Sequence, residues 1–246
     1  MTDWPAGYGR VVLAEVGSTL DEARRVATEH AGPVWIMAHR QTAARGRRGR
    51  AWSMPAGNFA ATLVLALNEP PAQRALRSFV MSLALYRSCV ELTGDDGAFA
   101  LKWPNDLLLN GGKVAGILLE SLSVPEGLAI GVGVNLADSP TVSEVEEGAV
   151  PPVSILRETG TQIGPEHFLD TLARHYASCE ARFQTYGFSA IRSSWLAHAA
   201  RIGEEVTART GRETITGTFE DVDADGHLVL RGARGVSRIA AADVYF

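Results

Sequence analysis

Residues 101–116, LKWPNDLLLNGGKVAG, contain the clearest fold signal in the chain. Asn110 and Gly111 stand between two apolar runs, and an Asn-Gly pair in that setting favours a two-residue β-hairpin turn. Trp103 and Pro104 precede the first run and predict an extended turn, because proline fixes its own φ. The stretch therefore predicts a tight hairpin that the chain enters from a fixed turn.

The same stretch holds both lysines of the chain, Lys102 and Lys113, although 23 residues are lysine or arginine. Arginine is a poor substitute where a compact ammonium must face a single oxygen, so the two lysines are candidates for such a site; a codon bias towards arginine is the alternative. The hairpin would fold Lys113 back alongside Asn105 and Asp106. At an effective dielectric near 20 and about 4 Å, an ammonium attracts a phosphoryl or carboxylate oxygen by about 4 kcal/mol. That attraction is large enough to matter to a transition state.

The remaining patterns alternate between short apolar strands and helices. Strands are predicted at residues 11–16, 34–40, 59–67 and 128–136. Helices are predicted at 20–30, at 72–93 and within 151–200, where 165–187 is the longest amphipathic piece. Ser18 and Thr19 offer a hydroxyl cap for the first helix. After Gly203 the hydrophobic period changes to two, with Gly and Asp-Gly turns, and this predicts short strands, the last of them at residues 236–246. We therefore expect an α+β fold, with a mixed central β-sheet flanked by helices in residues 1–200 and a small β-barrel in residues 201–246.

The composition is that of a globular protein with a real core: 246 residues, 46% hydrophobic and 21% charged. The formal net charge of −5 excludes the overall basic field of a dedicated nucleic-acid binder, so any anion site must be local. Cys89 and Cys179 lie in apolar segments without partners and are expected to be buried thiols in a reducing cytosol. No export signal or long apolar run is present, which favours a cytoplasmic enzyme or binder without a membrane anchor.

Four arginines crowd residues 41–52, QTAARGRRGRAW, in a predicted loop between two buried strands. Three interpretations compete: a solvated surface loop, a nucleic-acid contact, and a site for a small polyphosphate or acyl-phosphate. Gly46 and Gly49 would let the backbone wrap a small ligand. The absence of interleaved aromatic residues and the acidic remainder of the chain favour the small anion.

Other site patterns are weak. Asp221, Asp223, Asp225 and Gly226 imitate the opening of a calcium loop, but its twelfth position is Gly232 rather than Glu, so we expect a β-turn there. The histidines lack metal-ligand spacing, and no P-loop or dinucleotide fingerprint is present.

The strand at 128–136 carries glycines at alternate positions, Gly131 and Gly133. Bare backbone on one face of a strand predicts close approach by a ligand or another chain.

Taken in order, these motifs resemble the biotin protein ligases, also called holocarboxylase synthetases. The matching pieces are the G-S-T turn, Q-x-x-x-R-G-R-R-G-R-x-W, K-W-P-N-D, G-K-V-A-G-I-L and G-V-G-V-N-L, and they cover residues 17–136. The resemblance implies a class II synthetase-like catalytic sheet followed by an SH3-like barrel.

The resemblance also implies a two-step reaction. Biotin and Mg²⁺-ATP give biotinyl-5′-adenylate and pyrophosphate, and a lysine of a biotin carboxyl carrier protein then attacks the mixed anhydride. Mg²⁺ would be bound mainly through ATP rather than by protein ligands. Lipoate or octanoate ligases of the same fold are the nearest alternative, and a non-enzymatic nucleic-acid binder is the alternative from another class. Monomer and homodimer both remain open.

The family's site residues carry over by motif. Lys113 is expected to be the main catalytic residue, together with Arg47. The resemblance assigns biotin contacts to Ser18, Thr19, Leu20, Gln41, Arg45, Gly46, Arg47, Lys113 and Gly116. It assigns ATP or adenylate contacts to Arg45, Arg47, Arg48, Trp52, Lys102, Asn105, Asp106, Lys113 and Asn135.

Two positions depart from the family pattern, and one segment is missing. Leu20 stands where the family usually has Asn, and Ala44 where it has Gly. Ala44 would cost about 1 kcal/mol if that position needs a positive φ. The first strand begins near Val11, which leaves no room for the N-terminal DNA-binding domain of bifunctional members. We therefore expect a monofunctional ligase without sequence-specific DNA binding, which tight operator-like binding in a gel shift would overturn.

Overall fold

A computed structural model describes residues 4–246 except 31, 124–125 and 142–147. Its larger sheet has seven strands in the order β1-β2-β3-β7-β6-β5-β4. The strands are β1 (Gly9–Val16), β2 (Val34–Gln41), β3 (Phe59–Ala66), β4 (Phe99–Lys102), β5 (Asp106–Leu109), β6 (Gly112–Ser123) and β7 (Glu126–Val134). β1 and β2 are parallel and the other neighbours antiparallel, so the predicted mixed sheet is confirmed.

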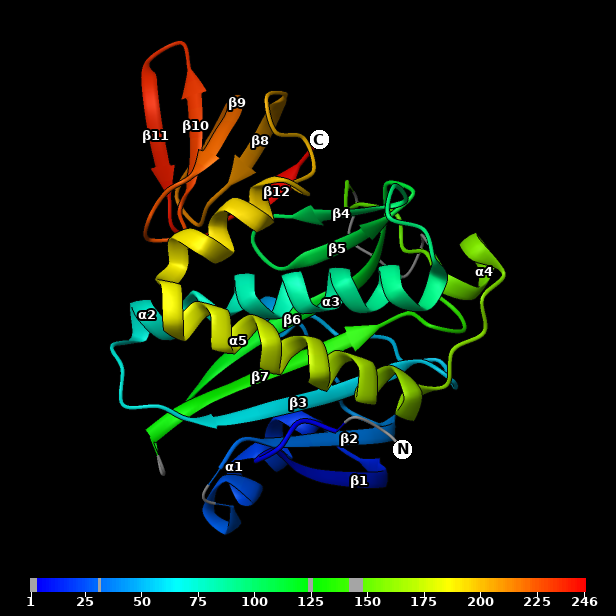
Figure 1. The fold of residues 1–246 in the computed structure, drawn as a ribbon. Coiled ribbons are helices and arrows are strands. Elements are labelled where there is room, and N and C mark those ends of the chain that lie inside the picture. The colour runs from blue at the N-terminus through cyan, green and yellow to red at the C-terminus, as the bar shows by residue number, and fades with distance from the viewer. Residues whose placement is uncertain (1–3, 31, 124–125, 142–147) are drawn as a thin grey trace.

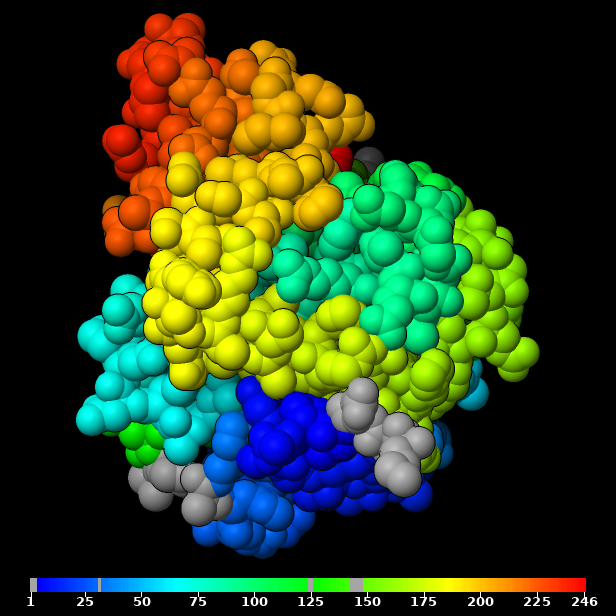
Figure 2. All heavy atoms as spheres, in the orientation of Figure 1, coloured from blue at the N-terminus to red at the C-terminus, as the bar shows by residue number. Residues whose placement is uncertain are grey.

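The helices cover both faces of this sheet (Figure 1). They are α1 (Thr19–Glu29), α2 (Pro71–Ala75), α3 (Arg77–Thr93), α4 (Ile155–Thr159) and α5 (Pro165–Leu196). α3 and α5 pack together on one face, which the space-filling view shows covered by their teal and yellow atoms (Figure 2). α1 packs on the opposite face, where Leu20, Ala23 and Val26 contact a separate apolar cluster.

One helix prediction was wrong and another matches the structure. The single helix expected at 72–93 is two helices, because the chain turns tightly at Leu76, whose N–H bonds the carbonyl of Gln73 three residues back. Long α5 bends at Gly187, which has φ 71° and ψ −175°, outside helical values. Only glycine reaches that backbone region readily, so the predicted amphipathic helix 165–187 ends at a real break.

The C-terminal part forms a five-stranded antiparallel sheet in the order β11-β10-β9-β8-β12. Its strands are β8 (Glu205–Arg209), β9 (Thr214–Val222), β10 (Leu228–Gly232), β11 (Gly235–Ile239) and β12 (Asp243–Tyr245). Residues 236–246 were expected as one strand, but they form β11 and β12 on opposite edges of this sheet. The predicted small C-terminal β domain is thus confirmed as an antiparallel sheet, in which no ladder joins the two edges among residues 202–246.

The predicted hairpin is confirmed and lies where the two sheets meet. Asn110 and Gly111 have φ of 50° and 81° and turn β5 into β6, as an Asn-Gly turn requires. Trp103, which precedes a cis proline, is 3% exposed and donates its indole N–H to the carbonyl oxygen of Gly226 at 3.0 Å. The hydrophobic core runs without interruption from the larger sheet into the smaller one, so the hairpin is held against both.

Candidate active site

A cavity of about 740 Å³ opens on the α1 side of the larger sheet, within the range of small-molecule sites. Its walls come from the start of α1, the arginine loop 41–52, the hairpin β5–β6, β7 and β12. The sequence-predicted residues that line it are Ser18, Thr19, Leu20, Gln41, Arg45, Gly46, Arg47, Trp52, Lys102, Asn105, Asp106, Lys113, Gly116 and Asn135. Arg48 is the exception, because it does not belong to the lining.

Glycines make room for this cavity on one face of the sheet. A Cβ on Gly131 would lie 2.9 Å from Leu20 Cδ1, and one on Gly133 would lie 2.7 Å from the indole of Trp52. A Cβ on Gly116, which lies on the adjacent strand β6, would lie 3.3 Å from the same indole. The sequence predicted close approach by a ligand or another chain at these glycines, but the structure places Leu20 and Trp52 of the same chain there.

Hydroxyl and amide groups gather at the α1 end of the cavity. Ser18 caps α1 by accepting from the Leu20 N–H at 3.3 Å, as predicted. Gln41 Oε1 accepts from the backbone N–H of Thr19 at 2.8 Å and from its hydroxyl at 3.1 Å. Thr62, buried in β3, donates to the Thr19 hydroxyl at 2.8 Å. The Gln41 amide NH₂ donates to the sulfur of Met54 at 3.7 Å. Because sulfur is a weak acceptor, an oxygen of a ligand could replace it.

Thr62 was not identified from the sequence. Its only local signal is a polar residue within the apolar run 59–67, and its partner lies 43 residues away.

Lys102 of β4 and Lys113 of β6 both lie near Asp106 of β5. Lys113 Nζ lies 2.7 Å from Asp106 Oδ1 and 5.7 Å from the centre of the Trp52 ring. Asn105 donates to the Ile117 carbonyl oxygen at 2.6 Å, which ties the entry turn to β6. Burial lowers the pKa of Lys102, against the opposing pull of Asp106. A buried ammonium with an incompletely compensated charge favours an anionic ligand.

The tip of the arginine loop is exposed to solvent at Arg48 and Arg50, but its guanidinium groups are paired with carboxylates. Arg45 contacts Asp21 of α1 at 2.9 Å and Glu120 of β6 at 3.1 Å. The hydrogen bond from Arg45 lowers the pKa of Asp21 below its ordinary value, although burial opposes this. Arg47 turns inward, and its Nη1 lies 3.1 Å from the Ala242 carbonyl oxygen. Burial lowers the pKa of Arg47, so its positive charge is only partly compensated.

The loop backbone shows whether Ala44, which stands where the family has Gly, is strained. The described non-glycine residues with positive φ are Arg48, Asn110 and Arg201, so Ala44 is not strained. Its carbonyl oxygen accepts from the Trp52 N–H at 3.1 Å, which closes the base of the loop. The departure from glycine at this position therefore has no backbone cost.

The lining is locally basic in an acidic protein. Five basic side chains (Arg45, Arg47, Arg50, Lys102 and Lys113) and two acidic ones (Asp106 and Asp243) give the lining a formal charge of +3, against −5 for the whole chain.

Asn135 is a polar member of this basic lining. Its amide NH₂ donates to the Val153 carbonyl oxygen at 3.0 Å, whereas its Oδ1 is buried without a hydrogen-bond partner among the described residues. That oxygen has almost no accessible surface, so what the cavity offers a ligand here is its excess of basic side chains.

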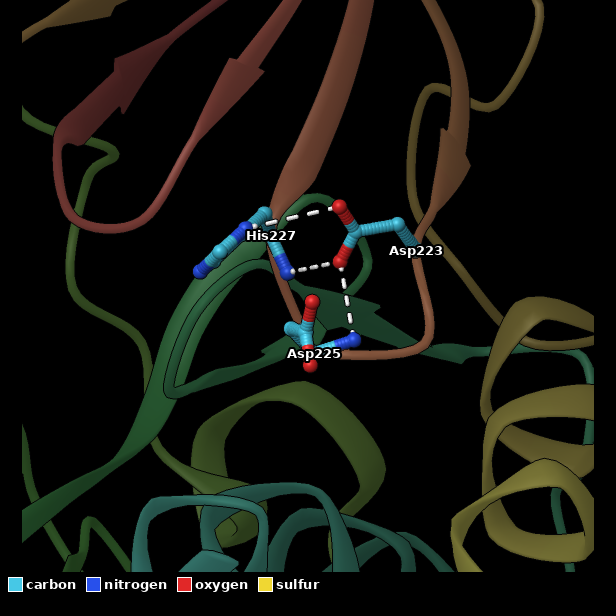
Figure 3. A group of neighbouring side chains, drawn as sticks. All are labelled: Asp223, Asp225 and His227. Atoms are coloured by element: carbon cyan, nitrogen blue, oxygen red, sulfur yellow. Dashed lines mark hydrogen bonds and ion pairs between the residues drawn. The ribbon is translucent and has the colours of Figure 1, made fainter. Parts of the chain in front are cut away.

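The Asp-rich turn after β9 is a separate feature (Figure 3). Asp223, Asp225 and His227 lie close enough together to bind a metal. However, one Asp223 oxygen already accepts from the backbone N–H groups of Asp225 and His227 at 3.0 and 2.9 Å. Such hydrogen bonds are those of a β-turn, in keeping with the turn expected from the sequence.

Comparison with protein families and curated relatives adds independent information. The model described as "Biotin/lipoate A/B protein ligase family" matches residues 12–135, and the "Biotin protein ligase C terminal domain" model matches residues 202–246. A biotin–[acetyl-CoA-carboxylase] ligase of Paracoccus denitrificans is 51% identical over 238 residues, which are 96% of this chain and 99% of that protein.

Solved structures agree on the fold. A biotin protein ligase from Aquifex aeolicus in complex with biotin and ATP superposes with a TM-score of 0.83 at 24% identity, covering 96% of this chain and 98% of that one. A Leishmania major biotin protein ligase in complex with biotinyl-5-AMP gives a TM-score of 0.66 at 26% identity, covering 95% and 99%. The chain therefore belongs to the biotin/lipoate A/B protein ligase family and, within it, to the biotin protein ligases.

Proposed function

We propose that this chain activates biotin with ATP to biotinyl-5′-adenylate and transfers the biotinyl group to a lysine of a biotin carboxyl carrier protein. The observation that carries the proposal is the convergence of both lysines and the arginine loop on one cavity. A carboxylate and a triphosphate are both anionic, and an enzyme that joins them must neutralise charge at the reacting phosphorus. Lys102, Lys113 and Arg47 in the lining would supply that neutralisation.

In the first step, a biotin carboxylate oxygen attacks the α-phosphorus of ATP and pyrophosphate leaves. We assign Lys113 and Arg47 to the oxygens that gain charge in this step, because Lys113 Nζ and the inward Arg47 guanidinium both line the cavity. The pairing of Lys113 with Asp106 at 2.7 Å holds the ammonium in place until a substrate oxygen competes for it. In the second step, an acceptor lysine amine attacks the anhydride carbonyl and AMP leaves.

The polar side chains at the α1 end of the cavity suit the neutral ureido head of biotin. A ureido ring needs both donors and acceptors, and Ser18, Thr19 and Gln41 provide them. Leu20 provides an apolar wall beside them. At the other end, we assign Trp52 and Asn135, which both line the cavity, to the adenine side.

Mg²⁺ would enter with ATP. The two carboxylates that line the cavity, Asp106 and Asp243, are both in ion pairs with basic side chains. Such a donor set does not form a dedicated protein cage for a cation, and Mg²⁺ usually keeps water and phosphate oxygens as ligands.

The cellular location, the oligomeric state and the domain boundaries are also proposals. No helix of the described residues is long and apolar enough to cross a membrane, and we propose a cytoplasmic enzyme that acts as a monomer or homodimer. We also propose a catalytic domain in residues 1–200 and a C-terminal domain in 201–246. The acceptor would be the carrier protein of acetyl-CoA carboxylase or a related carboxylase, as the name of the Paracoccus relative suggests.

ATP–pyrophosphate exchange, measured with biotin and with lipoate in parallel, tests the proposal. We expect exchange that depends on biotin, followed by biotin transfer to a carrier protein. Exchange that occurs with lipoate or octanoate but not with biotin would show that the chain is a lipoate or octanoate ligase instead. Salt-sensitive nucleic-acid binding without adenylation would favour the non-enzymatic alternative, against which the carboxylate partners of Arg45 and Arg48 already argue.

A further inference from the structure

One carboxylate of the C-terminal sheet gathers three arginines of the loop. Asp243, the first residue of β12, lies 2.6 Å from Arg48 Nη1, 2.9 Å from Arg50 Nη2 and 3.7 Å from Arg47 Nη1. Its side chain is 13% exposed. Burial raises the pKa of Asp243, but the hydrogen bond from Arg50 and the nearby guanidinium charges outweigh burial and hold it below its ordinary value. The carboxylate is therefore ionised and fully engaged at neutral pH.

These contacts join two parts of the chain that are 193–196 residues apart in sequence. The arginine loop follows β2 of the larger sheet, whereas β12 pairs with β8 of the smaller sheet. The Arg47 guanidinium adds a hydrogen bond to the carbonyl oxygen of Ala242, the residue before Asp243. The tip of the loop is thus held by the C-terminal sheet, while Arg45 at its base is held by Asp21 and Glu120.

The backbone of the loop tip explains how one carboxylate can orient three side chains. Arg48 has φ 58° and Gly49 has φ 73°, so the chain reverses direction within a single turn (Arg47–Gly49). A non-glycine residue with positive φ is uncommon and needs support from its surroundings. Here the reversal sends Arg48 and Arg50 to Asp243 and leaves Arg47 directed at the cavity.

We propose that Asp243 is a positioning residue that holds the arginine loop over the cavity and so retains the acyl-adenylate formed there. The retention part rests on the proposed function, whereas the loop-holding part does not. An isolated exposed ion pair contributes little, but a half-enclosed carboxylate shared by three guanidinium groups is a network. Asp243 acts through Arg47, Arg48 and Arg50 rather than on the reacting atoms.

Limited trypsin digestion of the ligand-free protein tests loop holding without any catalysis. Trypsin cleaves after arginine, and the fragments that begin within residues 46–51 can be followed by mass spectrometry. We expect Asp243→Asn to raise the rate of cleavage there by about tenfold, equivalent to about 1.4 kcal/mol of easier opening. Asp243→Glu should restore most of the protection. Glu220→Gln is the matched control, because it removes the ion pair with Arg231 in the same sheet and touches no loop arginine.

The second measurement is the rate at which preformed biotinyl-adenylate leaves the enzyme. We expect faster release and a higher KM for ATP in Asp243→Asn, with kcat at saturating ATP changed much less. Equal cleavage of the wild type and Asp243→Asn would overturn loop holding. Faster cleavage with unchanged release would overturn retention, and failure of every variant and the wild type to form an adenylate would instead refute the proposed function.

Discussion

Replacing Lys113 by Ala is the sharpest test of the proposed chemistry. Its ammonium lies 2.7 Å from Asp106 Oδ1 and is 30% exposed, so solvent screens it only partly. An ammonium about 4 Å from a phosphate oxygen gains about 4 kcal/mol at an effective dielectric near 20. Loss of one positioned donor to a developing charge typically costs about 10²–10³ in kcat. We therefore expect biotin-dependent ATP–pyrophosphate exchange to fall by about a hundredfold or more.

Part of that loss would come from Asp106 rather than from the missing ammonium. Without Lys113, the Asp106 carboxylate, whose side chain is 13% exposed, would face the triphosphate unpaired. Removing one partner of such a pair leaves an uncompensated charge. The double variant Lys113→Ala/Asp106→Asn should therefore be less impaired than the product of the two single effects.

Lys113→Arg is the control for charge alone. It keeps the positive charge but replaces a compact ammonium by a planar fork, so it should recover only part of the rate. Unfolding temperatures close to the wild type would show that the variants fold. Exchange at the wild-type rate in folded Lys113→Ala would refute the role assigned to this lysine.

Three further substitutions test other parts of the site. Arg47→Gly should loosen retention of the adenylate and biotinylate bystander proteins, and release at the wild-type rate would count against loop closure. Gly133→Ala would place a Cβ 2.7 Å from the Trp52 indole, and such overpacking costs about 1–3 kcal/mol. We therefore expect the KM for ATP to rise about tenfold. Gly211→Ala is the control, because a Cβ there meets no atom within 4 Å, and the KM should stay unchanged. Trp103→Phe would leave a buried carbonyl oxygen of the C-terminal sheet without its donor, and we expect a loss of about 1–3 kcal/mol in unfolding free energy, seen as a lower Tm; an unchanged Tm would show that this hydrogen bond does not stabilise the junction.

Local patterns were sufficient to predict most of the fold. The Asn-Gly pair predicted the hairpin, the apolar runs predicted strands of the larger sheet, and the period of two predicted the C-terminal strands, because these signals depend on residues a few positions apart. The break at Leu76 and the division of 236–246 into two strands were missed. These features depend on where the chain must turn to pack, and no Gly or Pro marks either point sharply enough in the sequence.

The sequence predicted the site's cations and, among its acidic residues, Asp106, but not the acidic partners of the arginine loop. Lys113 and Arg47 stand out because basic residues cluster in recognisable motifs, whereas Asp21, Glu120 and Asp243 are single acidic residues among 28. Asp243 meets Arg48 across 195 positions, a pairing that only the packing of the two sheets creates. Local sequence contains no signal for such a partner.

The paired state of the arginine loop changes what its positive charge can do. Free guanidinium groups would bind any polyanion, including nucleic acid. With Arg45 on Asp21 and Glu120, and Arg48 and Arg50 on Asp243, outward-facing charge is largely neutralised. Arg47, whose pKa burial has lowered, is directed inward towards a cavity that already contains Lys102 and Lys113. The loop's acidic partners thus restrict its attraction to an anion small enough to enter the cavity, which is the selectivity that an enzyme activating a carboxylate with ATP requires.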